Sequence, residues 1–346
     1  MKNSITETNP LLTVDLTTIS KLTGVKNRPK WHRAVGNTTF TESRNIANLI
    51  PCERLYLKFE GNNPTGTQKD RIAFAVSDMA KTEGYNVITT ATCGNYGAAL
   101  AYAADYFRIP ETHIFLPQSY HVPKKRLETM MKHKAQIHYV EGTYEHAVEY
   151  SCLIAKENGW FDANPGSEYT LDTCLGAYAG IGLEIYRSLR RVPDYILCPV
   201  SNGTTIAGVY YGFRLLLELN KIQEMPRLVA VSTRRGNPII KSFKLKSHLV
   251  MDLSPSEIKE TKINEPLTNW HSYDGQLALN VLYETNGFAE YASDTKMYEF
   301  ARHLKTNEGL NVHPASASTL AVLANMTKNN MPLKGTYVTV LTGREM

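Results

Sequence analysis

Segments with the pattern of a β-strand alternate with segments of helical spacing along nearly the whole chain, and this alternation restricts the possible folds. Residues 54–59 alternate like a strand, and residues 70–81 have apolar side chains at positions 72, 75, 76 and 79, which is helical spacing. Further strands are expected at 86–90, 114–117, 136–140, 195–200, 228–232 and 335–341. Further helices are expected at 95–108, 123–133, 143–158, 177–189, 206–219, 299–307 and 315–326.

Repeated β–α units predict mostly parallel, twisted sheets with helices on both faces, and therefore the α/β class. Two segments do not fit the repetition: residues 164–173 are expected to form a loop, and residues 250–290 are polar and have no clear pattern. No linker divides the chain, so two interleaved domains are expected rather than two separate ones. Ligands bind at the carboxyl ends of parallel strands, so binding residues are expected in the strand-to-helix turns.

Composition excludes several classes of protein. A chain of 346 residues with 42% hydrophobic and 21% charged residues can build the core of two packed domains. Its apolar runs are too short for a transmembrane helix, and its amino-terminal residues lack the apolar core of a secretory signal. The net charge of +5 is mild, so neither a nucleic acid nor a membrane is an expected partner.

The five cysteines are scattered and form no CxxC pair. This pattern argues against a disulfide framework and against a metal site. Reduced thiols in a cytoplasmic protein are expected instead.

The turn EGNNPTGTQKDR at residues 60–71 places a lysine at the start of a predicted helix. Gly61 and Gly66 have the spacing of a phosphate-binding loop, but Lys69 comes three residues after Gly66 and is followed by Asp70 instead of Ser or Thr. The nucleotide-binding interpretation is therefore disfavoured. Two interpretations remain: an exposed lysine paired with Asp70, or a lysine with a lowered pKa that forms a Schiff base with a carbonyl compound.

Two further turns contain small polar residues before a helix. TTATCGNYGA at residues 89–98 would present hydroxyl and amide donors at a positive helix end, which suits a carboxylate, although a capped helix would also use them. PVSNGTTIAG at residues 199–208 could hold a phosphate through backbone amides and threonine hydroxyls, or could be an ordinary capped turn. The last predicted strand ends at Thr342, a neutral hydroxyl that would leave a neighbouring heterocycle nitrogen largely unprotonated.

These four turns, in this order, resemble those of the fold-type II pyridoxal-phosphate enzymes, and NPTGTQKDR is most similar to the motif of threonine synthase. GNTTF at residues 36–40 and EGLNVHPASASTLAVL at residues 308–323 also resemble segments of that family. The resemblance covers roughly residues 30–343. It implies a larger cofactor-binding domain from residues 1–84 and 166–346, with a smaller inserted α/β domain at 85–165, both of three α/β/α layers, and the cofactor in the cleft between them.

The resemblance also implies roles for particular residues. Lys69 would hold pyridoxal 5'-phosphate as a Schiff base and act as the catalytic base, Asn95 would bind the phenolic oxygen of the ring, and Thr342 would meet the ring nitrogen. The phosphate would be held by Ser201, Asn202, Gly203, Thr204 and Thr205. The substrate carboxylate would be held by Thr92, Cys93, Gly94 and Tyr96.

The implied activity is that of a lyase on an activated amino acid, with O-phosphohomoserine and water giving threonine and phosphate as the leading reaction. A replacement synthase, a serine or threonine dehydratase and a non-catalytic ligand-binding homologue are the alternatives. Family members are often dimers, so a homodimer is an expectation by analogy.

Several departures leave the substrate open. Asn164-Pro165 is not followed by the arginine that threonine synthases tend to have, and the acids Glu168 and Asp172 come after it. Gln68, Ser201 and His313 also differ from the usual residues; His313 is expected mainly to start a helix. The basic residues Lys124, Lys125 and Arg126 could bind an anionic leaving group or form a solvated helix face.

Overall fold

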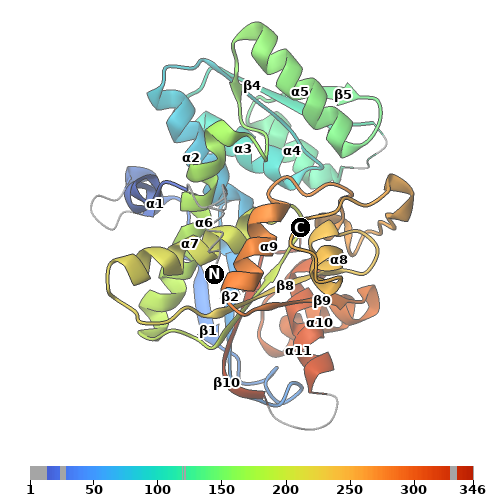
Figure 1. Cartoon of the computed structure of the whole chain (residues 1–346). Helices are drawn as coiled ribbons and strands as arrows, with labels where there is room; N and C mark the ends of the chain where they lie inside the picture. Colours follow the sequence, from blue (N-terminus) through green and yellow to red (C-terminus); the bar gives the residue numbers. More distant parts are fainter. Residues whose placement is uncertain (1–13, 24–28, 119, 121, 328–332, 346) are drawn as a thin grey trace, which may run out of the picture.

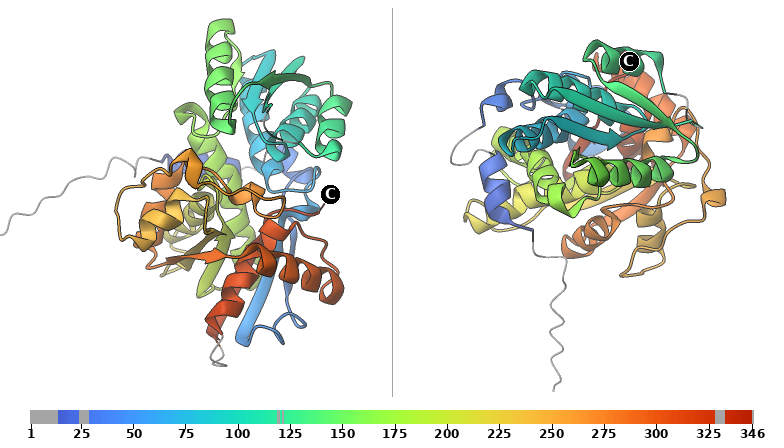
Figure 2. Two further views of the ribbon diagram at one scale, coloured as in Figure 1. Left: turned by 90° about the vertical axis from the view of Figure 1, so that its right-hand side faces the viewer. Right: turned by 90° about the horizontal axis from the view of Figure 1, so that it is seen from above.

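The computed structural model describes residues 14–23, 29–118, 120, 122–327 and 333–345, and within them the chain forms two sheets. A six-stranded sheet has the order β1-β2-β10-β7-β8-β9, and a four-stranded sheet has the order β5-β4-β3-β6. Figure 1 and Figure 2 show the smaller sheet and its helices stacked above the larger one. The prediction of an α/β protein with mostly parallel sheets is confirmed.

The strands of the larger sheet come from both ends of the described chain, whereas those of the smaller sheet are consecutive. The larger sheet contains β1 (Thr39–Glu42), β2 (Cys52–Phe59), β7 (Tyr195–Pro199), β8 (Arg227–Thr233), β9 (Phe288–Ala292) and β10 (Leu333–Leu341). The smaller sheet contains β3 (Val87–Ala91), β4 (Glu111–Pro117), β5 (Gln136–Val140) and β6 (Phe161–Asp162). All pairings are parallel except that of β1 with β2. The predicted domain boundaries, 84/85 and 165/166, stay a prediction.

Helices connect nearly all of the parallel strands, as crossovers between them require. They are α1 (Leu16–Thr23), α2 (Lys69–Thr82), α3 (Asn95–Phe107), α4 (Lys124–Lys132), α5 (Tyr144–Asn158), α6 (Glu168–Leu189), α7 (Thr204–Glu218), α8 (Pro238–Lys244), α9 (Gly275–Glu284), α10 (Asp294–Asn307) and α11 (Ser318–Met326). Short 3-10 turns lie at Lys30–Arg33, Glu60–Asn62, Pro255–Glu257, Glu265–Leu267 and Pro314–Ala317.

Both faces of the larger sheet are buried, because successive side chains of a strand point to opposite faces. In β8, Leu228 and Ala230 pack in the cluster that contains α6, α7 and α9, whereas Val229 and Val231 pack against α10 and α11. The smaller sheet follows the same rule: Ile114 packs with α3 and α4, and Phe115 packs with α5. Each sheet therefore forms the middle layer of three.

The structure differs from the sequence prediction in several places, and three of them concern long helices or the segment without a pattern. The helix expected from residue 177 begins at Glu168, so it includes half of the loop expected at 164–173. The helix expected from residue 299 begins at Asp294, where the Ser293 hydroxyl accepts a hydrogen bond from the backbone N–H of Lys296. The segment 250–290, which had no clear pattern, contains α9 and the start of β9.

All five cysteines are free, as expected. Across the described residues, no helix combines the length and the apolar character that crossing a bilayer requires. Within the same part of the chain, no group of three or more His, Cys, Asp or Glu side chains is arranged to hold a metal ion.

Candidate active site

One cavity lies where the carboxyl ends of β2, β3, β7 and β10 meet, and all the residues that were predicted for the site line it. They are Lys69, Thr92, Cys93, Gly94, Asn95, Tyr96, Ser201, Asn202, Gly203, Thr204, Thr205 and Thr342. The cavity has about 170 Å³ of space for the centres of water-sized molecules, at least ten times the ~10–15 Å³ that one water needs. It can therefore hold a ligand of considerable size.

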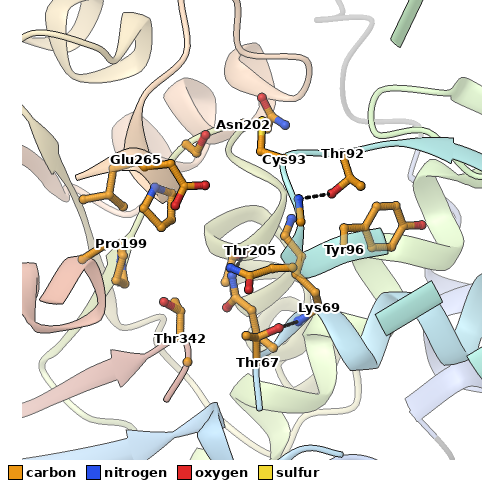
Figure 3. A pocket seen from close by; sticks show the side chains of 18 of the residues that line it. Thr67, Lys69, Thr92, Cys93, Tyr96, Pro199, Asn202, Thr205, Glu265 and Thr342 are labelled. Carbon is orange, nitrogen blue, oxygen red and sulfur yellow. Dashed lines mark hydrogen bonds between the residues drawn. The ribbon is translucent and has the colours of Figure 1, made fainter. Parts of the chain in front are cut away.

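Lys69 is the first residue of α2, and its side chain enters the cavity between Tyr96 on one side and Thr205 and Thr342 on the other (Figure 3). Its Nζ lies 5.8 Å from the centre of the Tyr96 ring. Burial lowers the pKa of Lys69, although the charges of Cys174 and Asp274 oppose this effect. A lowered pKa increases the fraction of neutral amine, which is the nucleophilic form.

Asp70 is not the partner of Lys69. Its carboxylate accepts hydrogen bonds from the backbone N–H and the hydroxyl of Thr65, at 3.0 and 2.8 Å, and so closes the loop that precedes α2. The interpretation of Lys69 as an exposed lysine paired with Asp70 is therefore wrong. The loop is held by its own polar residues, which leaves the amine of Lys69 directed into the cavity.

The turn before α3 offers backbone donors at a helix end. The Thr92 hydroxyl accepts hydrogen bonds from the N–H groups of Gly94 and Gly97, at 2.9 and 3.3 Å. Asn95 has a buried Oδ1 without a hydrogen-bond partner among the described residues. Tyr96 donates its hydroxyl to the Ala163 carbonyl at 2.8 Å, so its ring, not its hydroxyl, faces Lys69.

The turn before α7 has the form of an anion site. Gly203 has a φ of 98° and is followed by the fifteen-residue helix α7, whose first N–H groups have no partner within the helix and whose first residues, Thr204 and Thr205, line the cavity. The Thr205 hydroxyl accepts a hydrogen bond from Gln68 Nε2 at 2.9 Å, while the Thr204 hydroxyl donates to Asp274. Thr204 is thus partly engaged, whereas the backbone amides of the turn remain suited to a phosphate.

Thr342 directly follows β10 and lies on the side of the cavity opposite Tyr96 (Figure 3). Its Oγ1 lies 2.9 Å from Oγ of Ser316, which also accepts from the Gly343 N–H at 3.0 Å. Among the described residues, the hydroxyl of Thr342 therefore has a neutral hydrogen-bond partner and no carboxylate partner. Nothing at this hydroxyl would favour protonation of a ring nitrogen placed beside it.

The basic run of α4 is divided between solvent and cavity. Lys124 is 89% exposed and pairs with Glu128, whereas the Arg126 side chain is 5% exposed and lines the cavity. Glu265, which was not predicted for the site, also lines the cavity, and its carboxylate lies 3.8 Å from Nη1 of Arg126. The sequence does contain a signal for the position of Arg126. Arg126 lies four residues from Val122 and four from the buried Met130, which is the spacing of one helix face, so it is expected on the buried side.

The residues that depart from the family pattern have clear positions. Glu168 is exposed, and Asp172 accepts a hydrogen bond from the Asp15 N–H at 3.4 Å; neither lines the cavity, so neither would repel an anion there. His313 starts the 3-10 turn, where its Nδ1 accepts a hydrogen bond from the Ala315 N–H, and it also lines the cavity. Burial, aided by Arg126, lowers the pKa of His313 to about 4, so the ring is neutral near pH 7.

Taken together, the cavity provides a deprotonation-prone amine, a buried amide oxygen without a partner, and two helix ends that present N–H groups. These features fit an aromatic aldehyde that carries a phosphate, together with an amino acid whose carboxylate lies at the second helix end. The comparisons with known proteins agree.

Residues 32–343 match the family described as pyridoxal-phosphate dependent enzyme. Threonine synthase of Methanocaldococcus jannaschii is 28% identical over 293 residues, which cover 84% of this chain and 70% of that protein. Maize serine racemase has the same fold, with a TM-score of 0.77 at 19% identity over 96% of this chain and 94% of its own. Threonine deaminase isoform 2 from Solanum lycopersicum gives a TM-score of 0.75 at 13% identity, and the match covers 98% of this chain and 91% of that chain.

The match of the family over nearly the whole described chain agrees with a cavity whose lysine, amide and helix ends suit the same group. The chain belongs to the pyridoxal-phosphate dependent enzymes of fold type II, and pyridoxal 5'-phosphate is its cofactor.

Proposed function

We propose that the chain is a lyase of the threonine synthase type, which acts at the β- or γ-carbon of an activated amino acid. The leading reaction is O-phosphohomoserine plus water to threonine plus phosphate. The observation that carries the proposal is the position of Lys69, which lies at the meeting point of all four predicted turns, in a cavity that lowers its pKa. The threonine synthase relatives support this reaction over the others.

In this proposal, the chain's own residues bind, orient and move a proton. The backbone donors at the start of α3 would hold the substrate carboxylate, and the N–H groups at the start of α7, with Ser201 and Thr205, would hold the cofactor phosphate. Asn95 and Thr342 would orient the ring between them. The Lys69 amine would then take the proton from the substrate α-carbon, because burial favours its neutral form. When bound, pyridoxal phosphate supplies the electron sink for this proton removal.

Three alternatives remain within the proposal. A replacement synthase would use a thiol or amine in place of water, a dehydratase would release the unsaturated product, and a non-catalytic homologue would only bind its ligand. Product formation that requires a co-substrate would favour the first alternative. Colour without turnover of any amino acid would favour the last.

The homodimer and the cytoplasmic location stay predictions, which light scattering and cell fractionation would test.

The site is tested with Lys69→Ala. Borohydride treatment of the wild-type protein should trap the cofactor on a peptide that contains residue 69, and the variant should give no such adduct and lose its visible colour. Lys124→Ala, on the exposed side of α4, is the matched control and should trap as much cofactor as the wild type. An adduct on any other lysine would show that the assignment of Lys69 is wrong.

The reaction is tested by a screen of amino acids and their O-phospho and O-acyl esters. Changes in the cofactor spectrum should be largest for O-phosphohomoserine, and phosphate should be released without an added nucleophile. Phosphate release that depends on a thiol or amine would contradict the lyase and favour the replacement synthase.

A further inference from the structure

Arg126 is a buried cation whose hydrogen-bonding capacity is largely unused. The residue is 4% exposed, and its Nε and Nη1 have no hydrogen-bond partner among the described residues. The carboxylate of Glu265 is 3.8 Å from Nη1, which is too far for a hydrogen bond. A guanidinium that is removed from water without hydrogen bonds is costly, and such groups are normally paired.

The fold directs Arg126 to the turn that precedes α3. Its backbone N–H donates to the Pro123 carbonyl at 2.9 Å, so it lies in the first turn of α4. Gly94 allows the close approach: a Cβ on this residue would lie 2.6 Å from Cδ and 3.1 Å from Nη1 of Arg126. The guanidinium is therefore beside Gly94, in the turn that the proposed function assigns to the substrate carboxylate.

The other groups around Arg126 do not satisfy it. Glu265 is the nearest acid; burial raises the pKa of its carboxyl, while Arg126 and the hydroxyl of Tyr120 oppose this. The neutral ring of His313 accepts its hydrogen bond from Ala315. Figure 3 shows Glu265 on the side of the cavity away from Tyr96. The guanidinium of Arg126 thus faces the cavity, which is large enough for a ligand group.

We propose that Arg126 binds a second anionic group of the substrate, a phosphate or a carboxylate on the side chain of an amino acid whose α-carboxylate lies at residues 92–96. This proposal rests on the proposed function. It makes Arg126 the residue that selects an anionic side chain or leaving group, in the absence of an arginine after Asn164-Pro165. Glu265 acts as the counter-charge that the anion displaces.

The test compares Arg126→Gln with Glu265→Gln in the cofactor-loaded protein. The apparent affinity for O-phospho-L-homoserine is measured as the concentration that gives half of the maximal initial rate of phosphate release or, where no phosphate is released, by titration calorimetry. The affinities for L-2-aminoadipate and L-homoserine are measured from the cofactor spectrum and by titration calorimetry. In Arg126→Gln, the affinity for the preferred anionic compound should fall about 10- to 100-fold, as expected for loss of a hydrogen bond between charged groups. The affinity for neutral L-homoserine should change by less than about threefold, since its carboxylate contacts are intact. Lys124→Gln should leave all three affinities unchanged.

Glu265→Gln should have the opposite effect and bind the anionic compound more tightly than the wild type. This variant keeps Arg126, so it tests the proposal even if Arg126→Gln does not fold. The compound that loses more affinity in Arg126→Gln, O-phospho-L-homoserine or L-2-aminoadipate, identifies whether Arg126 binds a phosphate or a carboxylate.

Three results would overturn the proposal. The first is an equal loss of affinity for L-homoserine in Arg126→Gln, which would assign Arg126 to the α-carboxylate or to the fold. The second is no loss of affinity for either anion. The third is a wild type that prefers L-homoserine. Failure of the proposed function would appear separately, as a lack of the borohydride adduct on Lys69, while calorimetry with the same compounds would still decide the role of Arg126.

Discussion

Arg71 lies two residues after the cavity lysine, but its side chain points into a buried charge network. Its Nε is 2.6 Å from a carboxylate oxygen of Glu60, and its Nη2 is 2.8 Å from Glu184. Lys58 adds a second cation, 2.7 Å from Glu184. Two cations and two carboxylates balance one another and join β2, α2 and α6. The network thus anchors the first turn of α2, and with it the backbone of Lys69.

Arg71→Met should destabilise the protein by about 3–5 kcal/mol, because it leaves two buried carboxylates with a single cation. Urea unfolding measures the change. Lys241→Met, which breaks the exposed pair of Lys241 and Glu257, is the control and should cost no more than about 1 kcal/mol. Equal costs for the two variants would contradict a structural role for the buried network.

At the level of elements, the start of α7 depends on close packing against α9. A Cβ on Gly203 would lie 2.8 Å from the Asp274 carbonyl oxygen and 2.8 Å from the Ala278 Cβ, so the turn would have to move. Gly203 also has a φ of 98°, in the left-handed region that favours glycine. The geometry of the proposed phosphate site therefore depends on this residue.

Gly203→Ala should weaken binding of pyridoxal phosphate about tenfold or more, because displacement of the turn misaligns its N–H groups. The dissociation constant is measured by titration of the cofactor-free protein. Gly84→Ala provides the control: Gly84 has a similar φ of 84°, but a Cβ there would meet nothing within 4 Å. The control should lose stability by about 1 kcal/mol yet bind the cofactor normally. Equal cofactor binding by both variants would contradict the assignment of this turn to the phosphate site.

The helices, strands and turns differ in how well they could be predicted from the sequence. The four turns were predicted because each combines local signals: a strand pattern, small polar residues and a helix. The start of α6 was missed because its first residues, such as Glu168 and Thr170, are polar, and a polar helix end resembles a loop. Among the described strands, β9 is a half-buried edge strand paired with β8 alone, so its pattern is weak. The separation of Arg126 from Lys124 depends on how α4 packs over Gly94, which is a tertiary contact.

For the whole molecule, two sets of buried carboxyls respond to pH in opposite directions. Burial alone would raise the pKa of Glu60 and Glu184, but Arg71 and Lys58 hold it below its usual value. Their stabilisation is present above a pH of about 4.5, the pKa in the unfolded chain, and is lost as the pH falls.

Burial raises the pKa of Asp70 from 3.8 to about 7, against the hydrogen bonds from Thr65. The stability that depends on its proton is complete below pH 3.8 and is lost as the pH rises through 7.

Asp70→Asn should therefore gain stability relative to the wild type as the pH rises from about 4 to 7, by at most about 1.4 kcal/mol per pH unit, the value for one proton. Urea unfolding at several pH values across this range measures the difference. Glu157→Gln, an exposed carboxyl on α5, is the control and should follow the wild type at every pH. Parallel curves for Asp70→Asn and the wild type would mean that folding does not raise the pKa of Asp70. In that case the hydrogen bonds from Thr65, and the nearby charge of Arg344, outweigh the cost of its burial.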